Sequence, residues 1–316
     1  MINKKGIEFS FNWIFSIVVG IVVIFLAIYA ANSFIKTERT LQDTETVQQL
    51  QTLLNPLQTS IESTTKPSNI IFPREVKLMT QCIASTGMGE QKITLSSKNN
   101  IGGEWSSVSF SNKISSYLFM ESTVQGKQMH VLVAPFYMPY KVADLVILWS
   151  TNYCLVNAPQ NVKDELQILN ASGVIFADSK LKCSSNSNKV CFLNSPSDID
   201  EGCEIKVNTY LKQVRSTGKL VYYEGSLLYA SIFSNADIYE CNVKRLASRT
   251  KELANLYSQK SILLGDKSNC GGALAPILNN YANIVSIKDS RDLSNVMTQS
   301  NDIKKQQEDL LCALWK

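Results

Sequence analysis

The sequence FSFNWIFSIVVGIVVIFLAIYAA occupies Phe9–Ala31, and it decides how the rest of the chain is organised. No charged residue occurs between Trp13 and Ala31. At about 1.5 Å of rise per residue, a helix over that run is roughly 28 Å long, close to the ~30 Å hydrocarbon thickness of a bilayer. We therefore expect a leader and transmembrane helix in residues 1–35, with the remaining chain on one side of a membrane.

Basic residues flank the apolar run on both sides. Lys4 and Lys5 precede it, and Lys36 and Arg39 follow it. A basic pair on a short N-terminal segment favours a cytoplasmic N-terminus, which leaves the bulk of the chain extracellular. A cleaved secretory signal peptide is the alternative, but its apolar region is usually shorter, roughly 7–15 residues. We expect a retained single-pass anchor in the cell membrane.

Cysteine usage supports an extracellular location, because all eight cysteines follow the anchor. An even number on the outer side predicts disulfides formed in an oxidising compartment. There is no CxxC pair and His130 is the only histidine, so no metal site is expected. Eight cysteines allow 105 pairings, and we favour Cys270 with Cys312 and local bridges among Cys183, Cys191 and Cys203. The disulfide candidates are Cys82, Cys154, Cys183, Cys191, Cys203, Cys241, Cys270 and Cys312.

An amphipathic stalk helix is expected over residues 36–66. Pro56 should kink or end that helix near Asn55. The apolar stripe either packs on the head of the same chain or pairs with copies of itself, so self-association through the anchor and stalk stays open. Its members recur at helical steps of three and four, and they are Val47, Leu50, Leu54, Leu57 and Ile61.

Residues 67–235 read as a β-rich extracytoplasmic α/β head. A nearly continuous apolar strand at Ala143–Trp149, a helix from Pro159 to about Leu169 and a strand at Gly173–Ala177 suggest one βαβ unit with a parallel pair. The turn Ser150–Cys154 contains no glycine, so a phosphate-binding cradle is disfavoured and no cofactor is expected. Shorter strands are expected at Val76–Cys82, Gln91–Ser96, Ser107–Ser111, Ser116–Glu121, Met129–Ala134, Val190–Leu193 and Cys203–Val207.

The head is expected to end in a hairpin, and residues 236–316 to form a C-terminal helical subdomain. The hairpin would join Lys219–Tyr223 to Ser226–Ile232 through a turn at Glu224-Gly225. Short connections favour antiparallel packing of three helices, over Asp237–Leu264, Gly272–Val285 and Arg291–Trp315. The predicted fold class is α+β, with an N-terminal transmembrane helix, an amphipathic stalk, a β-rich head and this helical subdomain.

The N-terminus carries a candidate processing signal. The sequence Lys4-Lys5-Gly6-Ile7-Glu8, followed by the apolar helix, resembles the class III, prepilin-like leader of archaeal pilins and archaellins. In that family a membrane peptidase cuts after the glycine, which implies cleavage between Gly6 and Ile7. Here Glu8 would be second after the cut, whereas the bacterial pattern has the acidic residue fifth. The alternative is a pair of ordinary positive-inside lysines beside an incidental glycine.

The whole chain also resembles single-pass surface proteins of small-genome archaea. The resemblance lies in the basic-glycine leader with one anchor, the β-rich head with scattered cysteines, and the helical tail from Tyr239-Glu240-Cys241 onward. It implies a surface location and no particular activity.

Charge gives little evidence of a charged ligand. A net charge of +4 in 316 residues gives no argument for nucleic-acid binding. The densest cationic cluster is expected to be a solvated helix face paired with Glu240 and Glu252 rather than a site for acidic lipids or glycans. Its members are Lys244, Arg245, Arg249 and Lys251.

No catalytic constellation is predicted. Ser-His-Asp catalysis would require His130, and the chain has no GxSxG motif. Asn170-Ala171-Ser172 is a glycosylation sequon, which makes Asn170 a modification candidate. We expect a membrane-anchored structural or interaction protein, pilin-like or adhesive, whose partners are the lipid bilayer and a protein or glycan at the cell surface. The alternative is an exported hydrolase or ligand-binding receptor whose site the sequence does not reveal.

Overall fold

The structure is a computed structural model, and the chain divides into two compact units, Met1–Gln51 and Thr52–Lys316. It describes residues 11–54, 69–84, 87–98, 103, 105, 110–193, 202–264, 272–309 and 314–315. In the first helix, side chains are described from Trp13 to Phe34.

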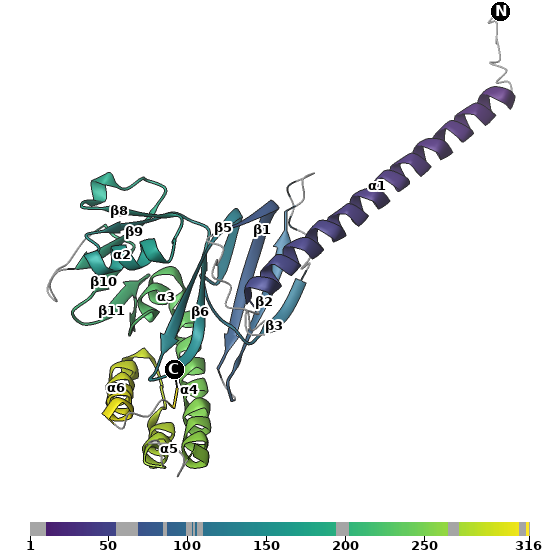
Figure 1. Cartoon of the computed structure of the whole chain (residues 1–316). Coiled ribbons are helices and arrows are strands. Elements are labelled where there is room, and N and C mark those ends of the chain that lie inside the picture. Colours follow the sequence, from purple (N-terminus) through teal and green to yellow (C-terminus); the bar gives the residue numbers. More distant parts are fainter. Residues whose placement is uncertain are drawn as a thin grey trace, which may run out of the picture. The chain divides into compact units, whose positions relative to one another are not determined.

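Helix α1 makes up most of the first unit and runs without a break over Phe11–Leu54 (Figure 1). Its segment Trp13–Phe34 is long and apolar enough to cross a membrane. The large apolar side chains of this segment are 42% to 77% exposed, as expected for a surface in contact with lipid. The predicted N-terminal apolar helix is confirmed. The side chains of residues 35–54, and all of residues 55–68 with Pro56, lie outside the described residues, so the stalk stripe stays a prediction.

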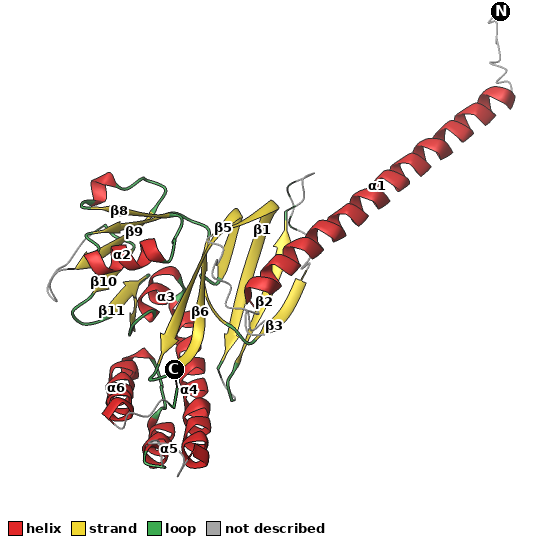
Figure 2. Cartoon of the chain, in the orientation of Figure 1, coloured by secondary structure: helices red, strands yellow, loops and turns green. Residues whose placement is uncertain are grey.

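The second unit contains two six-stranded sheets and a set of helices (Figure 2). Sheet 1 has the spatial order β3-β2-β1-β5-β6-β4, and its pairs are antiparallel except for β4 with β6. The five short strands predicted before residue 135 fall on strands of this sheet, although the start of Ser107–Ser111 lies outside the described residues. The strands of sheet 1 are β1 (Asn69–Ile83), β2 (Glu90–Ser97), β3 (Phe110–Ile114), β4 (Tyr117–Phe119), β5 (Thr123–Tyr137) and β6 (Lys141–Trp149).

Sheet 2 has the spatial order β12-β11-β10-β9-β7-β8. Strands β7 to β10 are parallel to one another, and β11 and β12 extend the sheet as an antiparallel hairpin. Helix α2 (Gln160–Ile168) connects β7 to β8, and the short helix η1 (Lys180–Lys182) follows β8. The strands of sheet 2 are β7 (Tyr153–Val156), β8 (Val174–Ala177), β9 (Asn188–Leu193), β10 (Ile205–Asn208), β11 (Gln213–Ser216) and β12 (Lys219–Tyr222).

The predicted strand–helix–strand unit had the wrong first strand. Ala143–Trp149 does form a strand, but as part of β6 it belongs to sheet 1, where it pairs with β5 and β4. The parallel partner of β8 is β7, which begins four residues after β6 ends. Both strands are apolar runs with almost every side chain buried, and a continuous apolar run does not indicate which sheet a strand joins.

The predicted hairpin at Glu224-Gly225 is also wrong. Ser226–Ile232 was expected to be a strand, but Leu227–Phe233 forms helix α3. All seven of its residues are buried, so the run has no exposed face and carries no period that separates helix from strand. The hairpin turn lies earlier, at Thr217 and Gly218, whose φ angles of 47° and 80° suit a two-residue hairpin turn.

The C-terminal segment is helical, as predicted, and shares one hydrophobic core with both sheets. Trp149 of sheet 1 stacks on Phe233 of α3 with ring centroids 4.3 Å apart, and Tyr153 of sheet 2 packs edge-on against Phe233 at 4.6 Å. The same core includes Leu246, Leu278 and other apolar residues of the C-terminal helices. These helices are α4 (Ala236–Leu264), α5 (Leu274–Ile284), η3 (Ser290–Asp292) and α6 (Leu293–Asp309).

Candidate functional site

Three disulfides are described in the head. Cys191 bonds to Cys203, which is one of the local bridges favoured from the sequence. Cys183 bonds instead to Cys154, and Cys82 bonds to Cys241 across 159 residues of sequence. Cys270 and Cys312 lie outside the described residues, so their pairing stays a prediction.

Two of these disulfides lie on the face of sheet 2 that points away from the main core. Alternate residues of β7 point to opposite faces, so Tyr153 and Leu155 enter the core while Cys154 and Val156 enter a separate small cluster. That cluster also contains Ala177 and Cys191, with Cys183 and Cys203 packed against it. The cystines thus supply much of the apolar cover on this face of the sheet.

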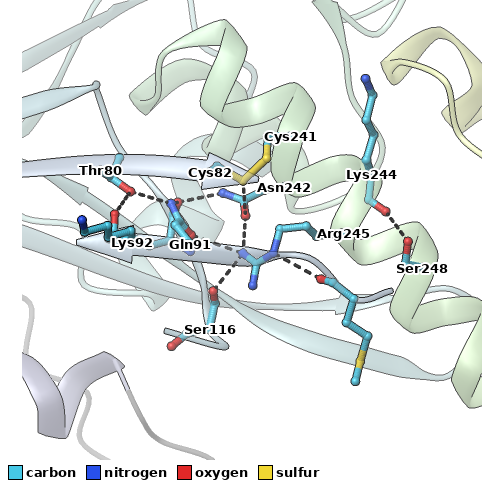
Figure 3. The surroundings of a disulfide bond; sticks show 12 residues. Thr80, Cys82, Gln91, Lys92, Ser116, Cys241, Asn242, Lys244, Arg245 and Ser248 are labelled. Atoms are coloured by element: carbon cyan, nitrogen blue, oxygen red, sulfur yellow. Dashed lines mark hydrogen bonds between the residues drawn. A yellow bond between two sulfur atoms is a disulfide. The ribbon is translucent and has the colours of Figure 1, made fainter. Parts of the chain in front are cut away.

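The third disulfide joins β1 to α4 beside a buried polar network (Figure 3). Gln91 on β2 and Asn242 on α4 are 0% exposed, and Arg245 on α4 is 1% exposed. Buried polar groups must be hydrogen-bonded to avoid a cost of about 1–3 kcal/mol each. The stability of the head therefore depends on the hydrogen-bond partners of these three side chains.

The Gln91 and Asn242 amides close the outer edge of β4. Leu118 in the middle of β4 donates its N–H to Gln91 Oε1 at 3.1 Å, and its carbonyl accepts from Gln91 Nε2 at 2.8 Å. Asn242 Nδ2 donates to the same carbonyl at 2.8 Å. The Gln91 side chain thus supplies the donor and the acceptor that a further strand would supply at an end strand.

Arg245 secures the loop that leads into β4. Its Nη1 donates to Asn242 Oδ1 at 2.7 Å and to the Ser116 carbonyl at 3.2 Å, and its Nη2 donates to the Ser115 carbonyl at 3.2 Å. The guanidinium also lies 4.8 Å from the centre of the Tyr117 ring, a cation–π contact. Burial lowers the pKa of Arg245 from its ordinary value, since these partners are neutral oxygens and a ring rather than carboxylates.

The predicted solvated cationic face of α4 is therefore wrong for half of its members. Arg245 is buried, and Arg249 donates Nε to the Val142 carbonyl at 2.7 Å, whereas Lys244 and Lys251 are exposed. Arg245 follows Ile238 by seven residues, which places it on the apolar face of the helix.

Glu240, one of the two acidic partners expected for this face, forms its hydrogen bonds elsewhere. Glu240 accepts hydrogen bonds from the N–H of Ser290 at 2.8 Å and from its hydroxyl at 2.6 Å. It thus fixes the start of η3 rather than a lysine on its own helix.

His130 is buried in a contact between the two sheets. Its Nδ1 lies 2.8 Å from both Asn69 Oδ1 and Ser172 Oγ, and Ser172 also donates to Asn69 Oδ1. A catalytic triad needs the nucleophile on one ring nitrogen and the orienting group on the other, but both partners here share Nδ1. The other nitrogen, Nε2, faces Gly173, where an added Cβ would lie 2.5 Å from it. The arrangement fits a structural role, with burial lowering the pKa of His130.

The remaining candidate residues are scattered. Asn170 is exposed, at φ 52° in the turn that follows α2, and Gly6 and Ile7 lie outside the described residues. Within the described ranges, no group of three or more His, Cys, Asp or Glu side chains is placed to hold a metal ion.

Comparison with known proteins gives no match, whether against protein-family models, curated proteins or solved structures. The roles of Gln91, Asn242 and Arg245 were not predicted from the sequence. The available signal was the helical spacing of Ile238, Asn242 and Arg245, which lie four and then three residues apart on one face of α4.

Proposed function

We propose that this chain is a membrane-anchored extracytoplasmic structural or interaction protein, with its N-terminus in the cytoplasm and its head outside. The observation that carries the proposal is the exposed apolar segment Trp13–Phe34 of α1. A helix with 42% to 77% of each large apolar side chain exposed needs lipid or another apolar partner. The three disulfides of the head support an oxidising compartment for everything after the anchor.

The same proposal includes a pilin-like or adhesive role at the cell surface. Its support is the leader Lys4-Lys5-Gly6-Ile7-Glu8, in which processing would fall between Gly6 and Ile7. In the head, the buried side chains of Gln91, Asn242 and Arg245 are bonded to the backbone of β4 and of the loop before it. A protein or glycan partner at the surface then fits the head better than a substrate does.

Fractionation of cells that express the full chain tests the anchor. The protein should stay in the membrane pellet after alkaline carbonate extraction, and protease added to intact cells should remove the head. Ile24→Lys places a charge in the middle of the apolar segment, which costs about 2.5–3.5 kcal/mol at a bilayer centre, and should shift the protein out of the pellet. Leu220→Lys, on the exposed side of β12, is the matched control and should stay in the pellet.

The mass of the mature N-terminus separates the forms of the proposal. A chain that begins at Ile7 supports prepilin-type processing, and an intact N-terminus supports a plain anchor. A soluble protein whose N-terminus lies after the apolar segment would show a cleaved secretory signal and overturn the anchor. A head protected from external protease would overturn the proposed orientation.

A further inference from the structure

Three of the four end strands in the two sheets are protected against pairing with another chain. The β4 edge is closed by the Gln91 and Asn242 amides. On β12, the Tyr222 N–H donates to Ser290 Oγ at 2.8 Å, and its carbonyl accepts from the Tyr239 hydroxyl at 2.6 Å. On β3, Lys113 is exposed and forms a 2.8 Å ion pair with Glu90 of the neighbouring strand. Such polar and charged cover is how proteins prevent edge-to-edge association.

The fourth end strand, β8, is apolar and has the sequence Val-Ile-Phe-Ala. Tyr153 of β7 donates its N–H to the Gly173 carbonyl at 2.8 Å, and β7 and β8 continue in parallel register from there. Because alternate residues of a parallel strand face the same neighbour, the N–H and C=O groups of Val174 and Phe176 point away from β7. In the part of the chain that the structure describes, these outward groups have no hydrogen-bond partner.

Exposed apolar side chains accompany this edge on both flanks. Ile175, in the middle of β8, is 45% exposed. Ile168, the last residue of α2 before β8, is 83% exposed, and Leu181 of η1 after β8 is 96% exposed. An edge with unpaired backbone and apolar surroundings is a template for another strand.

We propose that β8 pairs antiparallel with β8 of a second copy of this chain. A two-fold axis at Ile175 would place Val174 opposite Phe176 of the partner copy, so that their outward N–H and C=O groups bond in two reciprocal pairs. The two Ile175 residues then form the non-hydrogen-bonded pair, with Cα atoms about 4.5 Å apart. This pairing joins the two copies of sheet 2 into one continuous sheet.

Self-complementarity favours a second copy over an unrelated strand. The strand carries no charge, so the antiparallel register opposes no like charges within it, and it matches β-branched with aromatic side chains. A four-residue edge alone buries less than the roughly 1,200 Å² typical of a stable complex in solution. Copies anchored in the same membrane meet at a high effective concentration, which offsets the small buried area. The inference therefore rests on the proposed membrane anchor.

Site-directed cross-linking of the full chain in isolated membranes tests the pairing. Ile175→Cys, treated with a short bismaleimide, should give a dimer on a non-reducing gel, since the two thiols would face each other across the axis. Leu220→Cys on β12, at the opposite end of sheet 2 and 37% exposed, is the matched control and should give at least about tenfold less dimer. Intact-mass analysis of both variants, compared with the unmodified chain, confirms that the native disulfides, including the three that the structure describes, remain formed.

Ile175→Lys provides the converse test, because two lysines would then oppose each other at the centre of the pair. In nanodiscs, its dimer fraction should fall about tenfold relative to the unmodified chain, with an unchanged melting temperature because Ile175 is already half exposed. Equal cross-linking of Ile175→Cys and Leu220→Cys, or an Ile175→Cys adduct with the mass of a different protein, would overturn the self-pairing. Carbonate extraction of the same samples reports the anchor separately, so failure of the anchor and failure of the pairing are told apart.

Discussion

The β4 and β8 edges are both outer strands of six-stranded sheets, and the chain treats them in opposite ways. At β4, the side chains of Gln91 from β2 and Asn242 from α4 supply the hydrogen-bond donors and the acceptor that a neighbouring strand would supply. Both side chains are buried. At β8, the outward backbone has no such partner among the described residues, and apolar side chains remain exposed. An edge can therefore be closed by side chains within the fold, and an edge left open is a candidate for assembly.

The Cys82–Cys241 bridge should contribute most to keeping the β4 edge closed. Replacing both cysteines by alanine opens a loop of 159 residues, and the chain-entropy relation gives a loss of about 5 kcal/mol in the free energy of unfolding. The same relation gives about 3 kcal/mol for Cys191 with Cys203, which are 12 residues apart. Denaturant unfolding of the detergent-solubilised full chain measures both double variants. A larger loss for the short bridge would show that cover of sheet 2, rather than loop closure, dominates the stabilisation.

Arg245 is expected to have the next largest effect. Arg245→Met keeps an unbranched apolar side chain but removes the donor of the hydrogen bonds to the Ser115 and Ser116 carbonyls and to Asn242 Oδ1. Loss of a buried hydrogen-bonded cation should lower the free energy of unfolding by about 3–4 kcal/mol. The matched control is Lys244→Met, one residue earlier and exposed, with an expected change within about 0.5 kcal/mol. If the two variants unfolded at the same denaturant concentration, the network would not be what holds the β4 loop.

A substitution of Gln91 tests the β4 edge separately from the loop that precedes it. Gln91→Leu leaves the N–H of Leu118 without its acceptor and should cost about 2–3 kcal/mol. At the β12 edge, Ser290→Ala removes a single acceptor from Tyr222 and should cost about 1 kcal/mol. Thermal unfolding compares the two variants, and hydrogen exchange of the Leu118 amide should become faster in Gln91→Leu. Unchanged exchange at Leu118 would contradict the assignment of Gln91 as the partner of β4.

Sequence patterns predicted the local elements better than their assembly. The apolar run before Phe34 was recognisable because membrane thickness sets its length, and α4 was recognisable from its helical spacing. The identity of the first strand beside β8 was not predictable, because β6 and β7 are both buried on nearly every residue. Ser226–Ile232 was predicted to be a strand for the same reason, since all residues of the helix Leu227–Phe233 are buried.

The buried network was harder still to predict from sequence. The residue type of Arg245 does not indicate whether its side chain is solvated or bonded to loop carbonyls. Its partners Ser115 and Ser116 are 130 and 129 residues away in sequence. Only the position of Arg245 on the apolar side of α4 indicated burial. The contacts that distinguish the β4 and β8 edges are all long-range, so the contrast between them emerges from the structure alone.

The last expected effect concerns the residues that precede β8, where His130 Nδ1 lies within hydrogen-bonding distance of Ser172 and Asn69. Burial lowers the pKa of His130 below its ordinary value of about 6.5, so in the folded state the ring stays neutral to lower pH than in the unfolded chain. The unfolded state therefore binds the extra proton first, and stability is lost as pH falls through about 6.5 until the lower folded pKa is passed. His130→Gln retains hydrogen-bonding capacity but cannot titrate, so its stability should fall less between pH 7.5 and pH 5, by at most about 1.4 kcal/mol per pH unit. Other groups, such as Glu121, whose pKa burial raises, contribute to both proteins and cancel in the difference. Identical pH profiles for the two proteins would mean that the titration of His130 does not contribute to the pH dependence of stability.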